Sequence, residues 1–510
     1  MNVENTRILF RNSLLLPIII SVGWTPLGAG ETPPSENSPT LFNFRLFFAT
    51  GIQTAPFTGR VYVVVCEGTG EEPRNELRDW FHPPRVFAKD MKDVDPATTI
   101  LIDPSADAFP EPLSKLPTAS YRVQAIARRS LDHPVPGHGP GDLYSEPRTL
   151  ILKPQNPGAI ELTLNKEVAP SPFEESDRVK LIEIPSPMLS RFHHRDIKLR
   201  AAVVLPADWK PDGKESYPML YFIPGFGGSH RMAHMIARSR KQNSPADKVL
   251  LCVPDPTCYY GHSVFTDSNT NGPWGRAFTE ELIPEVERRF RAASKPQHRY
   301  VTGISSGGWS ALWLQIAYPE LFNGCWSHCP DPVDFRDFQR VDLYTDASNL
   351  FRESDGTRRP LARRKDEVTL YYQDFVQREA VLGPGGQIQS FEAVFSKRGP
   401  DGLPERFFDR KTGAINTTVA HTWEKYDINL ILKRNWSTLG PKLAGKLHIF
   451  AGEKDTFYLE GAVRLLQQTL TELKSDAEVI IVPGMAHGIH MEAIEPMYQK
   501  ILEEHRKTPE

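Results

Sequence analysis

Strand-like and helical runs alternate along the sequence from residue 178 almost to its C-terminus. Short apolar runs are separated by longer segments whose apolar residues recur at helical spacing. This order predicts the α/β class, with eight mostly parallel strands in one sheet and helices as the crossovers. The expected strands are residues 178–184, 198–205, 218–223, 249–253, 299–304, 323–326, 446–451 and 477–482, and the expected helices are residues 231–241, 276–291, 308–317, 459–473 and 490–505.

One long segment interrupts this alternation. Residues 330–445 separate the sixth expected strand from the seventh, whereas such a loop usually has about 2 to 6 residues. We therefore expect an insertion that caps or flanks the sheet. Its larger aromatic side chains are expected to form a small core of their own: Tyr371, Tyr372, Trp423 and Trp436.

The string GISSGG, at residues 303–308, lies between an apolar strand and a helix. A G-x-S-x-G string alone is a weak signal, because it arises by chance in roughly one of six chains of this length. The context is stronger, because Gly303 and Gly307 leave room for a tight turn in which the residue between them has a positive φ. The string therefore predicts a nucleophile elbow with Ser305 as the nucleophile. The alternative is a glycine-rich turn without chemistry.

A serine nucleophile needs a base and an acid that orients it, and hydrolases with this elbow carry the acid after the seventh strand. The segment GEKD at residues 452–455 occupies that place, and we expect Asp455 to be the acid. Asp455 could instead cap the following helix. The alternatives for the acid are Glu453 and, after the sixth strand, Asp331 and Asp334.

The base is expected after the eighth strand, where the segment PGMAH ends at His487. His490 is the competing histidine, but it lies where the last helix is expected to begin. Three residues in the required chain order thus predict a Ser-His-Asp triad of Ser305, His487 and Asp455.

The negative charge that develops on an acyl oxygen needs prepositioned donors. One expected donor is the backbone N–H of Ser306, the residue after the nucleophile. The other is the N–H of Phe226 in the loop PGFGG at residues 224–228, with Gly227 as second choice. This loop could also be an ordinary turn, and its glycines do not match a dinucleotide-binding motif because residue 230 is His.

These segments resemble the putative esterase family of the α/β-hydrolase superfamily, which includes enterochelin esterases, S-formylglutathione hydrolase (esterase D), feruloyl and acetylxylan esterases and mycolyltransferases. The resemblance rests on PGFGG (224–228), EELIP (280–284), GISSGG (303–308), GEKD and GMAH. It covers residues 178–505 apart from the insertion, and implies an α/β-hydrolase fold and ester chemistry. Pro224 and Gly225 stand where many relatives have His-Gly.

Two more segments are candidates for contact with substrate. The loop NGPWG at residues 271–275 precedes the helix that leads to the elbow, so Trp274 either contacts substrate or packs in the core. Tyr259, Tyr260 and His262 follow the fourth strand, whose carboxyl end also faces the expected site. We take Trp274 and Tyr260 as candidate substrate-binding residues.

The N-terminal part has a different sequence pattern, without the alternation of strands and helices. Residues 41–166 contain short β-rich runs broken by turn residues, which predicts an immunoglobulin-like β-sandwich. Proline-rich linkers flank it at residues 31–40 and 168–177, and the catalytic domain is expected at 177–510. Every catalytic candidate lies between Phe226 and His487, so the sandwich is expected to be accessory. It would either hold substrate or pack against the hydrolase and shape its cleft.

Charge and the first residues bear on partners and location. A net charge of −3, from 60 Lys and Arg against 63 Asp and Glu, does not favour a nucleic-acid surface. Residues 1–30 read as a signal peptide, with Arg7 and Arg11 before an apolar run and small residues at 28–30. We therefore expect a secreted or periplasmic protein without a stable membrane span after cleavage. The alternative is an uncleaved N-terminal anchor.

The five cysteines have no zinc-site spacing, so no metal is implied. Cys258 and Cys329 both follow the carboxyl ends of expected strands and are candidates for a disulfide, although two other pairings are as easy to draw.

Together these features predict a serine carboxylic-ester hydrolase that forms an acyl-enzyme and needs no cofactor. Its substrate would be a small or polysaccharide-linked ester, such as an acyl or feruloyl ester or a siderophore. The alternatives are an acyltransferase, a serine peptidase of the same fold and a non-catalytic glycan-binding protein.

Overall fold

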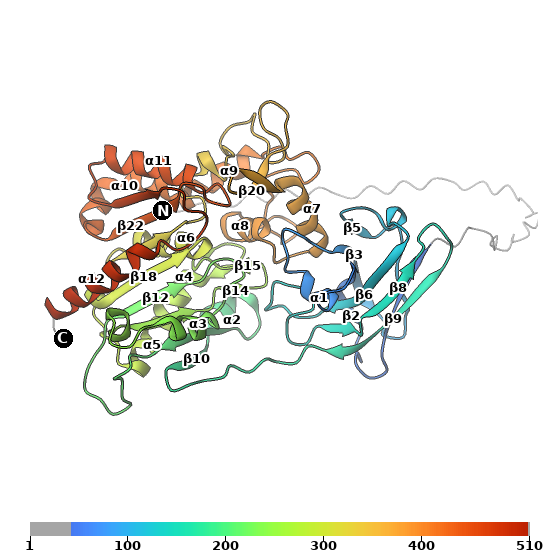
Figure 1. Cartoon of the computed structure of the whole chain (residues 1–510), viewed down its shortest axis with the longest axis horizontal. Coiled ribbons are helices and arrows are strands. Elements are labelled where there is room, and N and C mark those ends of the chain that lie inside the picture. The colour runs from blue at the N-terminus through green and yellow to red at the C-terminus, as the bar shows by residue number, and fades with distance from the viewer. Residues whose placement is uncertain (1–41, 508–510) are drawn as a thin grey trace, which may run out of the picture. The chain divides into compact units, whose positions relative to one another are not determined.

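An eight-stranded sheet dominates the C-terminal part of the computed structural model, which describes residues 42–507 (Figure 1). The strand order is β10-β11-β13-β12-β18-β19-β22-β23. Only β11 pairs antiparallel with its neighbours, and the other pairs are parallel. This is the α/β-hydrolase order, and the expected fold class is confirmed. The strands are β10 (Val179–Pro185), β11 (Lys198–Val204), β12 (Met219–Ile223), β13 (Leu250–Pro254), β18 (Arg299–Ile304), β19 (Cys325–His328), β22 (Leu447–Gly452) and β23 (Glu478–Val482).

Helices connect these strands, and the five expected helices are present. The expected helix 276–291 contains a π-helical stretch, Ala277–Leu282, immediately before the helix that carries Pro284. Proline has no N–H to donate and its ring displaces the preceding turn, which accounts for the irregularity. The helices are α2 (Pro187–His193), α3 (Met232–Ser239), α4 (Trp274–Arg276), α5 (Ile283–Phe290), α6 (Ser306–Ala317), α11 (Glu460–Glu472) and α12 (Ile494–Lys507), and short hairpins pair β14 (Thr257–Cys258) with β15 (Gly261–His262) and β16 (Asp267–Ser268) with β17 (Gly272–Pro273).

The sheet is buried on both faces, as its near-continuous apolar strands require. Along β11, Ala201 and Val203 join one hydrophobic cluster, whereas Ala202 and Val204 join another on the opposite face. Side chains of successive strand residues point to opposite faces, so both clusters are needed to cover the sheet. The carboxyl ends of the parallel strands are left free for the loops that follow them.

The insertion does not have a separate core, so that expectation was wrong. Tyr372 and Trp423 are fully buried in the same cluster as the hydrolase helices, and Trp436 packs against that cluster. A single core shared by the insertion and the hydrolase buries more apolar surface than a small core within the insertion would. The elements of the insertion are β20 (Pro360–Arg364), β21 (Glu367–Tyr371), α7 (Tyr372–Leu382), α8 (Gln387–Phe395), α9 (Thr417–Thr422) and α10 (Ile428–Leu443).

The described N-terminal part is all-β except for one short α-helix, α1 (Pro73–Glu76), and one 3₁₀ turn, Leu113–Lys115. Its nine strands form a single hydrogen-bonded sheet, β4-β1-β9-β7-β6-β2-β3-β5 with β8 paired to β6, that wraps a cluster of buried residues. The two layers of the expected sandwich are thus parts of one curled sheet. Its strands are β1 (Asn43–Phe48), β2 (Phe57–Glu67), β3 (Arg85–Val94), β4 (Ile100–Ile102), β5 (Asp107–Phe109), β6 (Ala119–Arg128), β7 (Leu143–Ser145), β8 (Arg148–Leu152) and β9 (Ala159–Glu167).

The β-sheet domain docks on the end of α7. Arg60 Nε donates to the carbonyl of Val381 (2.9 Å), the hydroxyl of Tyr62 to that of Leu382 (2.7 Å), and the guanidinium of Arg128 to that of Pro384 (2.5 Å). Val381 also joins a buried cluster made otherwise of β-domain side chains. The described residues consequently form one compact unit.

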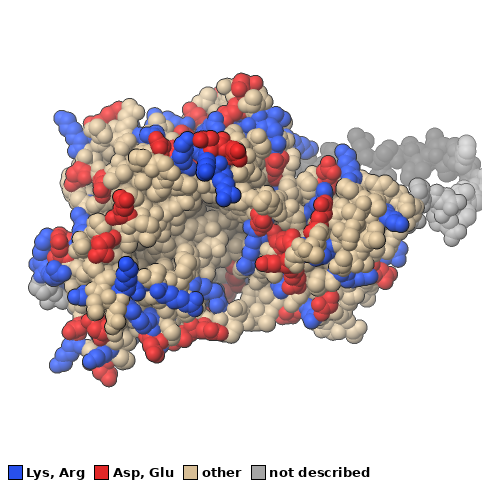
Figure 2. All heavy atoms as spheres, viewed as in Figure 1, with Lys and Arg blue, Asp and Glu red and all other residues tan. Residues whose placement is uncertain are grey.

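The face seen in Figure 2 carries acidic and basic side chains side by side, and the hollow near its middle is mostly uncharged. Across residues 42–507 no helix combines the length and the apolar character needed to cross a bilayer. The expected signal peptide, residues 1–30, and the linker at 31–40 lie outside the described residues.

The docking contact between the β-domain and the insertion predicts a sensitive position at Gly385. Its φ is +122°, and an added Cβ would lie 2.2 Å from the carbonyl oxygen of Pro134. Gly385→Ala should therefore lower the free energy of unfolding by about 2 kcal/mol or more. Thermal unfolding measures this. Gly158→Ala is the matched control, because nothing lies within 4 Å of its added Cβ. Equal unfolding temperatures of the two variants would contradict the close approach.

Candidate active site

A strained serine lies between β18 and α6. Ser305 has φ 58° and ψ −127°, a conformation rare for residues other than glycine. The neighbouring glycines permit this turn: a Cβ on Gly307 would lie 2.0 Å from the carbonyl oxygen of Ile223, and one on Gly303 would lie 2.2 Å from that of Gly307. The string GISSGG therefore forms the sharp strand-to-helix turn of a nucleophile elbow.

His487 and Asp455 meet at the same edge of the sheet. They lie in the loops after β23 and β22, and His487 Nδ1 is 2.8 Å from Asp455 Oδ2. Asp455 is fully buried, and its other oxygen accepts the backbone N–H of Phe457 (2.8 Å). A buried carboxylate fixed in this way holds the imidazole in one tautomer, with Nδ1 protonated and Nε2 left for proton transfer.

The surroundings of His487 favour its charged form. Burial alone would lower the pKa of His487, but hydrogen bonds with Asp455 and then Cys329 outweigh burial and raise it. The ring of Phe457 lies edge-on to the imidazole, with centroids 5.1 Å apart. Stabilisation of an imidazolium is what a histidine that takes a proton from serine requires.

The alternative candidates for acid and base have other partners. Glu453 is exposed and accepts the backbone N–H of Gly484 (3.0 Å). Asp334 pairs with the guanidinium of Arg336. The ring of His490 packs against Phe450. Within residues 42–507, none of the three forms a hydrogen bond with Ser305.

Asp331, which follows β19, contacts both serines of the elbow. Its Oδ1 is 3.3 Å from Ser305 Oγ, and its Oδ2 accepts the hydroxyl of Ser306 at 2.5 Å. Burial raises the pKa of Asp331 to about 6, although the hydroxyls of Ser306 and Ser305 and the nearby His487 favour its ionised form. The sequence marked this residue only as a substitute acid.

The hydrogen bond that the structure shows for Ser305 Oγ thus goes to Asp331. Within residues 42–507, no hydrogen bond joins Ser305 to His487. His487 nevertheless acts electrostatically on Asp331, so the three side chains share one region. Catalytic hydrogen bonds are often long or misaligned before substrate binds, and rotation about χ1 of Ser305 is all that a serine needs to change partner.

The expected oxyanion donors lie on either side of Ser305. Ser306 is the first residue of α6, where an N–H has no acceptor within the helix. On the other side, residues 225–228 form a turn closed by the N–H of Gly228 and the carbonyl of Gly225, with φ +79° at Gly227. This leaves the Phe226 N–H outside the closing bond. A Cβ on Gly225 would lie 3.1 Å from Ser305 Cβ, so this loop runs against Ser305.

His262 holds that loop in place. Its Nε2 is 2.9 Å from the carbonyl oxygen of Pro224, and its Nδ1 accepts the backbone N–H of Val264 (3.0 Å). Burial lowers the pKa of His262 to about 4, so the ring is neutral at pH 7 and donates from Nε2. The sequence left this histidine as an open candidate for substrate contact, and the structure gives it a supporting position instead.

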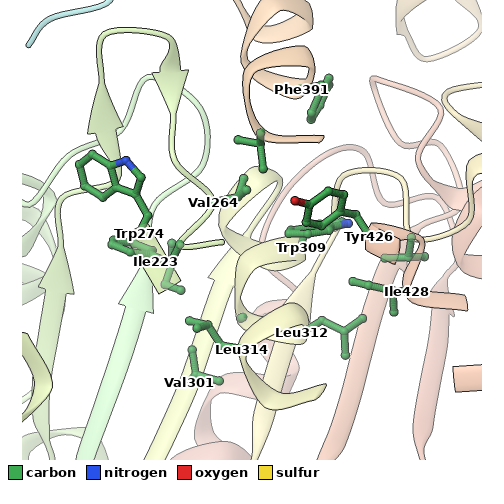
Figure 3. Packing of buried hydrophobic residues seen from close by; sticks show 14 of the residues in the cluster. Ile223, Val264, Trp274, Val301, Trp309, Leu312, Leu314, Phe391, Tyr426 and Ile428 are labelled. Carbon is green, nitrogen blue, oxygen red and sulfur yellow. The ribbon is translucent and has the colours of Figure 1, made fainter. Parts of the chain in front are cut away.

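The two candidate substrate-binding residues differ in their placement. Trp274 is buried in the hydrophobic core (Figure 3), and its indole N–H donates to the carbonyl of Asn271 (2.9 Å). This is the packing alternative, so the structure does not favour substrate contact. Tyr260 is partly buried against the same core, and its ring lies edge-on to Tyr259.

All five cysteines are free thiols, so the expected Cys258–Cys329 disulfide is wrong. Cys258 accepts from the side-chain amide of Asn271, whereas Cys329 lies beside His487. One potential ligand atom each from Cys329, Asp455 and His487 lie within 4.8 Å of one another. The sequence analysis missed this cluster because it made Cys329 a candidate for a disulfide. The position of Cys329 directly after β19, at the sheet edge that also carries Asp455 and His487, could have indicated it.

The raised pKa of Asp331 gives a pH-dependent stability. The pKa of this carboxyl rises from 3.8 to about 6 on folding, so the folded protein favours the protonated form. The contribution to the free energy of unfolding is therefore complete below about pH 4 and is lost as the pH rises through 6. Asp331→Asn stays neutral, so at pH 7 it should be more stable than the unchanged protein, by up to about 3 kcal/mol. The gain should shrink at pH 4. Chemical denaturation at both pH values measures it, and a gain independent of pH would contradict this account.

A family model and two relatives match parts of the chain. Residues 194–396 match the putative esterase family, a range that includes the loop at residues 224–228 and the turn at residues 303–308. Esterase Rv1288 and Esterase MT1326, from two strains of Mycobacterium tuberculosis, are each 27% identical over 158 residues. The matched region is 30% of this chain, and it spans about a third (34%) of the length of each relative.

A solved structure titled ferulic acid esterase superimposes on 65% of this chain and 99% of its own, with a TM-score of 0.37 and 13% identity. An S-formylglutathione hydrolase from Agrobacterium tumefaciens covers 64% of this chain and 93% of its own, with a TM-score of 0.36 and 12% identity. The match of the family model over residues 194–396 agrees with the resemblance seen in the motifs: this part of the chain is similar to the putative esterase family.

Proposed function

We propose that this chain is a serine carboxylic-ester hydrolase that works through an acyl-enzyme. The observation that carries the proposal is the buried Asp455–His487 pair, 2.8 Å apart, at the same sheet edge as the strained Ser305. A structural histidine does not need a buried carboxylate beside an elbow serine, whereas nucleophilic catalysis does. The match to an esterase family supports the same reaction class.

In the first half of the reaction, Ser305 Oγ attacks the ester carbonyl carbon while His487 Nε2 takes the hydroxyl proton. Asp455 holds the imidazolium that forms. The carbonyl oxygen becomes an oxyanion, which the backbone N–H groups of Phe226 and Ser306 stabilise. The C–O bond to the alcohol then breaks, and His487 returns the proton to the departing oxygen.

In the second half, His487 takes a proton from water, whose oxygen attacks the acyl carbon. The bond to Ser305 Oγ breaks, the proton returns to that oxygen, and the carboxylic acid leaves. An alcohol in place of water would give acyl transfer, so products decide between hydrolysis and transfer. No step of this scheme draws on a metal or a cofactor.

The substrate we propose is an ester on a small molecule or a polysaccharide, such as an acyl or feruloyl ester or a siderophore ester. The family supports an ester, and the signal-like residues 1–30 support an extracellular or periplasmic site of action. A panel of acetyl, feruloyl, siderophore and peptide substrates, with products identified by mass, tests the class directly. If the protein cleaves peptides and none of the esters, the esterase proposal is wrong and the serine peptidase alternative is correct.

Removal of the nucleophile should abolish the activity. Ser305→Ala should lower the rate of ester cleavage by about 10⁴-fold or more, because the three triad groups act as one unit. A fluorophosphonate probe should label the unchanged protein at Ser305 and leave the variant unlabelled, as read by peptide mass. Ser437→Ala, an exposed serine on α10, is the control and should react normally. Labelling at Ser306 would show that Ser306, and not Ser305, is the nucleophile.

Removal of the acid should change both rate and pH dependence. Asp455→Asn should lower kcat about 10⁴-fold through loss of imidazole orientation, and Asp331→Asn should cost far less. Because Asp455 raises the pKa of His487, the residual activity of Asp455→Asn should persist to lower pH before His487 becomes protonated. Rate profiles from pH 5 to 10 measure this. A larger loss in Asp331→Asn would make Asp331 the acid.

A further inference from the structure

One aromatic side chain of the β-sheet domain lies away from its own domain. Trp80 follows α1 in the loop that leads to β3, and its ring contacts Phe375 (centroids 4.9 Å apart), Phe226 (5.7 Å) and Phe457 (6.2 Å). All three belong to the hydrolase part or its insertion. Trp80 accordingly packs on the hydrophobic cluster of the hydrolase and not on either cluster of the β-domain.

Two of these partners are also neighbours of the reaction centre. Phe226 carries the backbone N–H that we assign to the oxyanion hole, and the ring of Phe457 lies edge-on to His487. Trp80 therefore spans from the oxyanion loop to the loop that precedes α11, next to the general base. The β-domain reaches the active site through this residue.

The aromatic cluster is not sealed. Phe375 is 2% exposed and forms its buried base, whereas Trp80, Phe226 and Phe457 are only partly buried. Their rings are apolar apart from the indole N–H of Trp80, and they adjoin the backbone of Phe226 and the imidazole of His487, which would face an ester. Flat aromatic faces and edges of this kind bind another ring with a preference for stacked or edge-on contacts.

The loop that carries Trp80 is held from both sides. One oxygen of Asp79 accepts the backbone N–H groups of Phe81 (2.8 Å) and His82 (2.9 Å), which closes the loop on itself. The buried guanidinium of Arg378 on α7 donates to the carbonyl of Leu77, just before the loop. Trp80 is consequently placed by the docked domain and does not hang from a free loop.

We infer that Trp80, with Phe226 and Phe457, forms a subsite for an aromatic or similarly flat apolar group of the ester, so that the β-sheet domain determines specificity. The inference rests on the proposed function, because it deepens the same site. It makes the β-domain one wall of the substrate site. Of the two roles expected for this domain, this is the one in which it packs against the hydrolase and shapes its cleft.

The test compares methyl acetate with two larger esters, methyl 3-phenylpropionate, which carries a phenyl group on the acyl side, and benzyl acetate, which carries one on the alcohol side. Acid release is followed by titration for the unchanged protein and for Trp80→Ala, Trp80→Phe and Phe81→Ala. Phe81 is the matched control, because it is the next residue in the loop but its side chain is 42% exposed. Thermal unfolding of each variant checks that it is folded.

We expect Trp80→Ala to lower the kcat/KM preference for at least one phenyl-bearing ester over methyl acetate by about 10-fold or more, mainly through KM. Trp80→Phe should restore part of the preference, and Phe81→Ala should leave it unchanged. An unchanged preference in Trp80→Ala, or an equal loss on all three esters, would overturn the inference.

A binding measurement separates this inference from the proposed function. Methyl 3-phenylpropionate and benzyl acetate are titrated by calorimetry into Ser305→Ala, with and without Trp80→Ala. Weaker binding of one of them in the double variant supports the subsite even if the unchanged protein hydrolyses no ester, which would remove only the proposed function. Equal binding of both esters overturns the subsite and leaves the hydrolase proposal standing.

Discussion

The close approach of two backbones at the elbow is the constraint on which the site depends. Gly307, in the first turn of α6, lies so near the end of β12 that no side chain fits between them. This contact brings the start of α6 and the loop after β12 together around Ser305. This close contact accompanies the positive φ of Ser305 and places the loop that carries the Phe226 N–H beside it.

The rest of the site follows from the parallel sheet. Because β18, β19, β22 and β23 run parallel, the loops after them emerge at one edge, and residues far apart in sequence meet there. Ser305, Asp331, Asp455 and His487 come from four such loops. Burial then separates their roles: Asp455 is fixed against His487, while Asp331 is held by the hydroxyls of the elbow and has a raised pKa.

The insertion and the β-domain complete the surroundings of this edge. The insertion shares the hydrolase core, and the end of its helix α7 and the turn after it accept three hydrogen bonds from the β-domain at residues 381–384. Gly385 permits this docking because any side chain there would meet Pro134. The β-domain and the insertion are far apart along the chain, but they contact each other in the folded protein.

The sequence by itself determined the local features of this protein. Strand and helix periodicity placed all eight strands within two residues, and the spacing after the fifth, seventh and eighth strands selected Ser305, Asp455 and His487. Only the tertiary structure decided what depends on distant neighbours. Cys329 lies beside His487 and not in a disulfide, and Trp274 packs in the core. His262 holds the loop after β12, and Trp80 contacts Phe226 and Phe457 from the other domain. Periodicity and motif spacing report a residue's own element and its place along the chain, whereas these contacts are set by how separate elements pack.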